Sequence, residues 1–232
     1  MKSRVAFVFM IAALGAACTA LPLFGDENLK PPAQTVKTEH FDFAPGGMIR
    51  VSESNGDLYI EAWDEPRVEM TVTKFLAYGL ESESAERATE RLEGLKVTAE
   101  KKSASELIIS TKPKSVRLEL ELRVPRNSQL DIHHHVGNVS ISGVIGDIRA
   151  ACGRGDIFLW LPSEGAYEVD ARNRFGKVSS DFPGASRSSF LIGQSFRSPG
   201  STPVRKLYLR MGFGGITLKP ILPESQGRVA TK

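Results

Sequence analysis

Three copies of one phrase follow each other at nine-residue intervals: Gly137-Asn138-Val139-Ser140-Ile141, Gly146-Asp147-Ile148-Arg149-Ala150 and Gly155-Asp156-Ile157-Phe158-Leu159. An earlier copy reads Gly56-Asp57-Leu58-Tyr59-Ile60, and weaker copies begin at Gly176 and Gly214. Glycine tolerates positive φ and Asp or Asn caps a turn locally, so each copy predicts a tight turn followed by a strand. A chain built from such copies is typical of an all-β repeat scaffold.

The spacing of the copies favours parallel stacking. The interval from Gly155 to Gly176 is 21 residues, and the interval from Gly176 to Gly214 is 38, or twice 19. One circuit of a parallel β-solenoid with two short faces needs about that many residues. We therefore expect a parallel β-solenoid-like repeat. Strands every nine residues also fit an antiparallel β-sandwich, which is the alternative.

Alternation along the strands predicts which side chains face the core, because successive strand residues point to opposite faces. The residues expected inside are Val139, Ile141, Ile148, Ala150, Cys152, Ile157, Leu159, Leu161, Ile216 and Leu218. Their neighbours Ser140, Ser142, Arg149, Phe158, Trp160 and Thr217 are expected outside. On this pattern Cys152 is a small buried hydrophobe and not a nucleophile.

One short helix is expected to interrupt the strands. Ser82 or Ser84 can cap it, Ala88 and Leu92 fall on one face, and Gly94 supplies a C-terminal stop.

The N-terminus reads as an export signal. Residues 1–17 combine Lys2 and Arg4 with an apolar run over residues 5–17, which is short for a membrane span. Cys18 follows this run as the cysteine of a bacterial lipoprotein does, so we expect lipid attachment at Cys18 and a membrane anchor. Cleavage after Ala20 is the alternative.

The rest of the chain is divided into three parts. Residues 18–38 are predicted to be a tether, residues 39–222 the β-strand-repeat domain and residues 223–232 a tail.

Charge is divided unevenly along the chain. Residues 171–232 hold eleven Lys and Arg against two acidic residues, a net charge of +9, whereas residues 18–170 have a net charge of −8. This division predicts an anionic partner, a lipid or a polysaccharide, for the C-terminal part. Pairing between the two halves of the domain is the equal alternative. The candidate anionic-ligand surface comprises Arg172, Arg174, Lys177, Arg205, Lys206 and Arg210.

Other conspicuous residues have simple structural explanations. His133 and His135 would share one face of a strand while His134 faces away, so at most two could bind one metal ion. Arg154-Gly155-Asp156 spells a cell-adhesion tripeptide, but the repeated phrase already requires its glycine and aspartate. We therefore expect no catalytic residues, no cofactor or metal and no nucleic-acid partner. A carbohydrate-active enzyme on the same scaffold is the alternative.

Several of these stretches together resemble a known family. They are the run from Val51 to Ile60, the segment Leu122-Arg123-Val124-Pro125 and the array of glycine phrases, which span roughly residues 40–220. They are similar to a bacterial family of exported β-strand-repeat proteins called putative adhesins, related to the head (GIN) domain of putative autotransporter adhesins. The resemblance implies a right-handed β-solenoid-like fold, a cell-envelope location and a binding or adhesion role without established catalytic residues. The resemblance also implies a further alternative, an accessory protein of envelope stress sensing. Residues 182–203 depart from the pattern and are expected to form an inserted loop.

Overall fold

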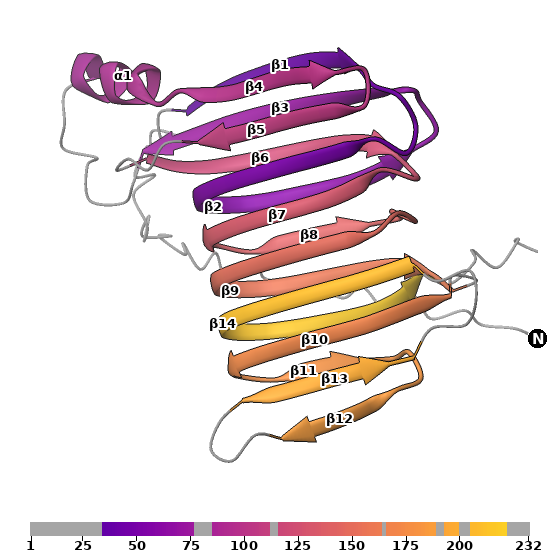
Figure 1. The fold of residues 1–232 in the computed structure, drawn as a ribbon. Helices are drawn as coiled ribbons and strands as arrows, with labels where there is room; N and C mark the ends of the chain where they lie inside the picture. Colours follow the sequence, from indigo (N-terminus) through magenta and orange to yellow (C-terminus); the bar gives the residue numbers. More distant parts are fainter. Residues whose placement is uncertain are drawn as a thin grey trace, which may run out of the picture. The chain divides into compact units, whose positions relative to one another are not determined.

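The computed structural model describes residues 34–76, 85–111, 116–163, 166–188, 193–199 and 205–221. Within these ranges the strands form one 14-stranded sheet (Figure 1). The predicted signal segment, Cys18 and the C-terminal tail lie outside the described residues. Strand β1 begins at Gln34, so it includes the last residues of the segment predicted as a tether.

The elements in chain order are β1 (Gln34–Asp42), β2 (Met48–Trp63), β3 (Arg67–Leu76), α1 (Ala85–Gly94), β4 (Val97–Ser103), β5 (Glu106–Thr111), β6 (Val116–Pro125), β7 (Gln129–Val136), β8 (Val139–Ser142), β9 (Ile148–Pro162), β10 (Tyr167–Phe175), β11 (Val178–Ser180), β12 (Ala185–Ser188), β13 (Gln194–Ser198) and β14 (Arg205–Ile221). The fold is therefore all-β with one short helix, as predicted. Leu92 of the helix is buried, and Lys74 Nζ donates hydrogen bonds to the Leu92 and Leu95 carbonyls.

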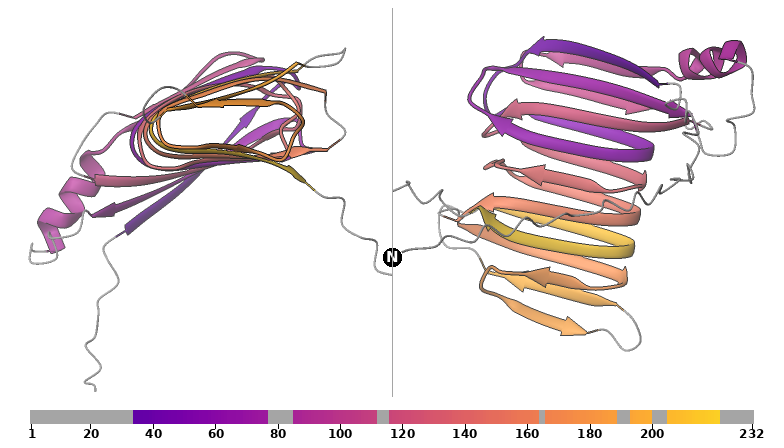
Figure 2. Two further views of the ribbon diagram at one scale, coloured as in Figure 1. Left: turned by 90° about the horizontal axis from the view of Figure 1, so that it is seen from below. Right: turned by 180° about the vertical axis from the view of Figure 1, so that it is seen from behind.

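Parallel strands make up the middle of the sheet. Each stretch of chain runs along one face, bends and continues along a second face, and we call such a stretch a layer. The described residues contain five such layers, stacked in the order β2, β7 with β8, β9, β14, and β10 with β11, and β5 and β6 pair with β2 at one end of the stack. Viewed along the stack, the bent strands superpose around a flattened ring (Figure 2).

The nine-residue interval of the phrases is half of one layer. Leu130 pairs with Ile148 and Val139 pairs with Ile157, so neighbouring layers are offset by 18 residues in sequence here. Consequently Gly137 and Gly155 occupy equivalent bends, whereas Gly146 lies between two layers. Strands outside the layers pair antiparallel: β1 with β3, β3 with β6, β4 with β5, and β13 with both β10 and β12.

A column of glycines forms the bend shared by five layers. These glycines are Gly56, Gly137, Gly155, Gly214 and Gly176, with φ between 128° and 139°. A Cβ atom added at any of them would overlap the backbone carbonyl of the preceding layer. The bend therefore requires glycine both for its left-handed backbone and for the close approach of successive layers.

The Asp or Asn that follows three of these glycines accepts a hydrogen bond from the backbone of the next layer. Asp57 Oδ1 accepts a hydrogen bond from the Asn138 amide at 2.9 Å, and Asn138 Oδ1 accepts one from the Asp156 amide at 3.1 Å. Asp156 Oδ1 in turn accepts one from the Gly215 amide at 2.6 Å. The expected local cap is thus replaced by a ladder of bonds between layers, which also accounts for the aspartate of the Arg154-Gly155-Asp156 tripeptide.

The order of the layers differs from their order in sequence. Leu207 of β14 pairs with Ile148 of β9 on one side and with Val169 of β10 on the other. The Gly176 and Gly214 copies therefore do not stack in sequence order, because β14 is inserted between the two earlier strands β9 and β10.

The core fills the space between the two faces of the layers. All ten residues that alternation places inside are buried, and the six placed outside are exposed or half-buried. One row of the core is mixed in chemistry: the residue three places before each column glycine is Glu53, His134, Cys152, Met211 or Asn173. All five are at most 5% exposed.

Candidate functional site

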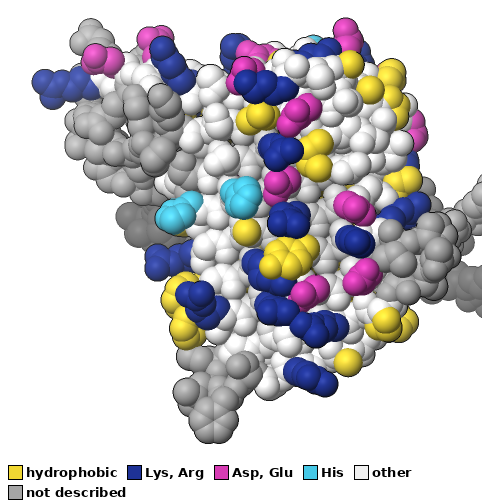
Figure 3. Space-filling model, viewed as in Figure 1, with side chains coloured by type: hydrophobic (Ala, Val, Ile, Leu, Met, Phe, Trp, Pro, Cys, Tyr) yellow, Lys and Arg dark blue, Asp and Glu magenta, His cyan; other side chains and the backbone are white. Residues whose placement is uncertain are grey.

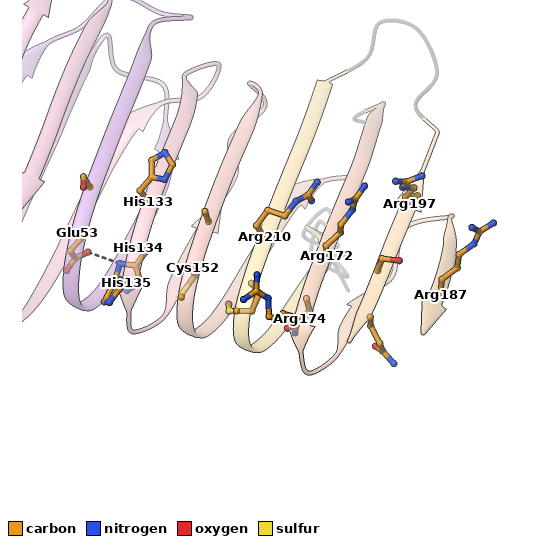
Figure 4. A pocket seen from close by; sticks show the side chains of 18 of the residues that line it. Glu53, His133, His134, His135, Cys152, Arg172, Arg174, Arg187, Arg197 and Arg210 are labelled. Carbon is orange, nitrogen blue, oxygen red and sulfur yellow. Dashed lines mark ion pairs between the residues drawn. The ribbon is translucent and has the colours of Figure 1, made fainter. Parts of the chain in front are cut away.

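A groove of about 1550 Å³ crosses the outer surface of β7, β9, β14, β10, β13 and β12. Figure 3 shows Lys and Arg side chains gathered over the lower part of the corresponding face. The arginines that line the groove are Arg172, Arg174, Arg187, Arg197 and Arg210, and His133 and His135 line its other side (Figure 4). The groove is therefore basic along most of its length.

The alternation and register of the strands bring these side chains together. Arg210 of β14 pairs with Arg172 of β10, which pairs with Ser195 of β13, which pairs with Arg187 of β12. Arg197 lies two residues along β13 from Ser195, so it has the same outward orientation. Side chains that are distant in sequence thus form one row across four neighbouring strands.

Small residues make the floor of the groove. Ala151, Gly153 and Gly212 lie between the histidines of β7 and the arginines of β14 and β10. A Cβ atom at Gly153 would stand 2.6 Å from the His135 carbonyl oxygen, so close packing of the strands favours glycine there. The surface is hollow at this point because no large side chain rises from it.

Two of the arginines share a carboxylate. Arg172 Nε lies 3.2 Å from Asp170 Oδ1, and Arg210 Nη2 lies 3.1 Å from Asp170 Oδ2. Burial raises the pKa of Asp170 more than any other single effect, but the hydrogen bonds and charges of the two arginines together hold the pKa below its ordinary value of 3.8. Arg210 also lies over the Tyr208 ring, with its guanidinium carbon 3.5 Å from the ring centroid.

The other three arginines are not paired in this way. Arg174, Arg187 and Arg197 are exposed, and no carboxylate among the described residues forms an ion pair with any of them. An exposed guanidinium group without a carboxylate partner can bind a carboxylate, sulfate or phosphate group through two parallel hydrogen bonds.

The six basic residues singled out in the sequence are divided by the structure. Arg172, Arg174 and Arg210 line the groove, whereas Lys177, Arg205 and Lys206 do not. Lys177 follows the column glycine Gly176, and the Lys206 amide donates a hydrogen bond to Asp147 Oδ1 at the opposite edge. Arg172 and Arg210 both pair with Asp170, which lies on β10 with Arg172 and beside β14, and which is the last residue of the acidic part defined above.

Sequence reasoning missed Arg187 and Arg197. Both fall in residues 182–203, which were expected to form an inserted loop, and the described part of this segment contains the antiparallel strands β12 and β13. The short alternations Ala185-Ser186-Arg187-Ser188 and Gln194-Ser195-Phe196-Arg197 are the signal that indicates two strands.

A buried acid–base pair lies beneath the histidine side of the groove. His134 Nδ1 is 3.4 Å from Glu53 Oε2, and both side chains are fully buried. Burial raises the pKa of Glu53 above 4.5, although His134 opposes this shift. Within the described ranges, no group of three or more His, Cys, Asp or Glu side chains is arranged to hold a metal ion.

Cys152 occupies the next position in the same core row as His134. Burial raises the pKa of its thiol to about 11, and its Sγ lies 3.5 Å from the Gly137 carbonyl oxygen. The thiol is therefore protonated and shielded at neutral pH, in agreement with its predicted role as a small buried side chain.

None of the described helices is long and apolar enough to span a membrane.

Comparisons with known proteins give structural neighbours only. No family model matches the sequence, and no curated protein matches it. The fold is similar to that of a putative cell adhesion protein from Clostridium sporogenes, with a TM-score of 0.53 and 13% identity over 82% of this chain and 100% of that chain. A putative adhesin from Bacteroides fragilis aligns with a TM-score of 0.25 and 10% identity, over 82% of this chain and 99% of that chain. A putative adhesin from Parabacteroides distasonis aligns with a TM-score of 0.23 and 12% identity, over 79% of this chain and 97% of that chain. The similarity to the Clostridium protein shows a shared fold.

Proposed function

We propose that this protein is a non-enzymatic, exported binding or adhesion protein that presents a β-solenoid-like surface and holds anionic groups in its basic groove. The observation that carries the proposal is the set of three exposed arginines without carboxylate partners, Arg174, Arg187 and Arg197, which share one groove. The similarity in fold to a putative cell adhesion protein supports the same role.

The chemistry of the lining favours binding over hydrolysis of a glycosidic bond. Such hydrolysis uses two carboxyl groups that face each other across the substrate. Among the described residues that line the groove, Glu53 is the only carboxylate, and its side chain is fully buried against His134. The other residues that line the groove are arginines, histidines and uncharged side chains, which suits the capture of an anion.

Binding of a sulfated polymer tests this proposal directly. Fluorescein-labelled dextran sulfate is the probe, and labelled neutral dextran of the same length is its uncharged counterpart. We expect the dextran sulfate to bind, the neutral dextran to remain free, and added salt to weaken binding because exposed charges are screened over about 8 Å at 0.15 M salt.

A matched pair of triple variants locates the site. Arg174→Ser, Arg187→Ser and Arg197→Ser together remove three charges from the groove. Lys177→Ser, Lys206→Ser and Lys219→Ser together remove three exposed charges outside it. The first variant should lose binding and the second should keep it, whereas equal losses would show a diffuse attraction that does not involve the groove.

We also propose that Cys18 is lipidated and anchors the protein to a membrane of the cell envelope. The proposal is supported by the position of Cys18 after the apolar run of residues 5–17. Cell fractionation of a Cys18→Ser variant should move the protein from the membrane to the soluble fraction. An intact mass that corresponds to cleavage after Ala20 would refute it.

A further inference from the structure

The charged groups of the groove are spread along a line. Arg210, Arg172 and Arg187 belong to one row across β14, β10, β13 and β12, with Ser195 between the last two arginines. Neighbouring strands lie about 4.8 Å apart, so the backbone positions of Arg210 and Arg187 are about 14 Å apart. A single carboxylate or phosphate can contact only one part of this row, whereas a linear polymer with repeated charges can contact all of it.

The hollow floor favours a chain over a flat surface. Because Gly153 and Gly212 have no side chains, the bottom of the groove lies below the heads of the arginines around it. A planar membrane would touch the protruding side chains and leave the floor empty. A polymer one residue wide can lie in the hollow and contact both the arginine side and the histidine side.

An exposed aromatic pair lies at the glycine bend of β10 and β14, one residue along the chain from residues that line the groove. Phe213 and Phe175 stack with their ring centroids 4.5 Å apart and their planes 7° apart, and Phe213 is 50% exposed. They follow the lining residues Gly212 and Arg174 directly in sequence. An exposed aromatic surface of this kind indicates a contact with an apolar partner surface. Sugar rings have apolar C–H faces, whereas a bare phosphate chain has none.

We infer that the groove binds a linear acidic polysaccharide, which lies across the strands with its carboxylate or sulfate groups on the arginine row and a sugar ring against Phe213. This inference rests on the proposed function and narrows its ligand to one chemical class. Arg174 lies next to Phe175 in sequence, so it can hold an acidic group of a sugar whose ring contacts the aromatic pair.

Oligogalacturonates of increasing length are the probes, measured by competition against labelled polygalacturonate. Several linked contacts raise affinity far above that of one contact. The galacturonate hexamer should therefore bind with an affinity at least about 100-fold higher than that of galacturonic acid. Linear polyphosphate with the same number of charges is the comparison ligand without sugar rings. It should bind more weakly than the hexamer.

Two single variants separate the aromatic contact from the charge contact. Phe213→Ser should weaken binding of the hexamer about tenfold and leave binding of polyphosphate unchanged, whereas Arg174→Ser should weaken both. Tyr59→Ser removes another exposed aromatic ring, one whose neighbours in sequence do not line the groove, and should change neither. Thermal unfolding of each variant checks that the fold is retained.

The outcomes distinguish this inference from the proposed function. Equal affinity for polyphosphate and the hexamer, with no effect of Phe213→Ser, would overturn the polysaccharide and leave a general anion-binding groove. Binding to phosphatidylglycerol vesicles without binding to the hexamer would overturn it in favour of a membrane surface. Failure of dextran sulfate, the hexamer and the vesicles alike would overturn the proposed function itself.

Discussion

The parallel layers and the antiparallel strands at their ends are built on different rules. Each layer from β2 to β10 bends at a glycine of the column and is hydrogen-bonded to its neighbour at that bend. The antiparallel end strands have no such bend, and β12 is exposed at every position. The layers are therefore constrained by backbone contacts that tolerate little change, whereas the end strands can vary in sequence at small cost to the fold.

Both regions contribute to the groove in a way that follows from this difference. The layers supply the floor, Gly153 and Gly212, and the arginines that pair with Asp170. The end strands β12 and β13 supply Arg187 and Arg197, which have no carboxylate partner among the described residues. A constrained scaffold and the exposed arginines proposed to bind the ligand thus occupy neighbouring strands of one sheet.

The largest effect is expected at the glycine column. Gly155→Ala places a Cβ against the Gly137 carbonyl in addition to straining the left-handed backbone, so it should destabilise the fold by about 4 kcal/mol or prevent folding. Gly46→Ala is the control, because Gly46 also has a positive φ but its added Cβ would lie 3.9 Å from Asn127 Nδ2, an ordinary van der Waals distance. It should cost only about 1–2 kcal/mol in chemical denaturation. Equal losses in the free energy of unfolding for the two variants would show that the clash between layers adds nothing to the cost of Gly155→Ala.

Alternation within a layer predicts a second large difference. Ile157 is fully buried, so Ile157→Asp places an unpaired charge in the core and should destabilise the fold by about 4 kcal/mol or more. Phe158→Asp, on the outer side of the same strand, should cost much less, since it mainly removes the stacking contact with Trp160. Thermal unfolding of the two variants makes the comparison, and similar melting temperatures would contradict the assigned faces.

Asp170→Asn should have opposite effects on stability and binding. The carboxylate has a lowered pKa, so it stabilises the fold above its ordinary pKa of 3.8, and this contribution is lost as the pH falls through the lowered value. The variant should lose at most about 1 kcal/mol at pH 7 and nothing at lower pH, where both forms are uncharged. Freeing Arg172 and Arg210 should tighten dextran sulfate binding several-fold. Weaker binding would mean that Asp170 positions the arginines for the ligand.

Glu53→Gln should reveal the cost of a buried acid. Since the pKa of Glu53 is raised in the fold, ionisation destabilises the native protein as the pH rises above 4.5. The melting temperature of the variant minus that of the wild type should therefore be more positive at pH 7 than at pH 4. A difference in melting temperature that does not change with pH would mean that pairing with His134 fully offsets the cost of burying the ionised Glu53 carboxylate.

The smallest effect on stability is expected at the end strands. Arg187→Ser and Arg197→Ser remove exposed side chains without carboxylate partners, so each should change the free energy of unfolding by less than about 0.5 kcal/mol. Both should nevertheless weaken binding of dextran sulfate. A loss of stability comparable to that of Phe158→Asp would remove the distinction between scaffold and binding residues.

Sequence patterns predicted the local features of the layers well. The alternation around Ile148 and Ile157 assigned the inner and outer faces, because burial of one face imposes a period of two on any strand. The nine-residue interval also anticipated a layer of 18 residues. These features depend on residues that are close together in sequence, so they can be predicted from the sequence.

Features that depend on distant segments were not predictable in the same way. The phrases at Gly176 and Gly214 are alike because both fill the same bend, and nothing in either one tells which layer it follows. The groove presents the same problem: Arg210 and Arg187 meet only because β14 lies beside β10 and β12 lies beyond β13. The basic C-terminal charge indicated the region, but pairing determined which residues it brings together.

The position of β14 between β9 and β10 also restricts the order in which the layers can pair during synthesis. A ribosome delivers β9 and β10 before β14, yet each of them pairs with β14. Until residue 221 has been made, the layer between β9 and β10 is missing and two parallel strand edges stay open to unwanted partners. The stack is thus completed from within by β14, the last of the described strands, so that losing this strand would separate β10, β12 and β13 from the other strands and not merely shorten the stack.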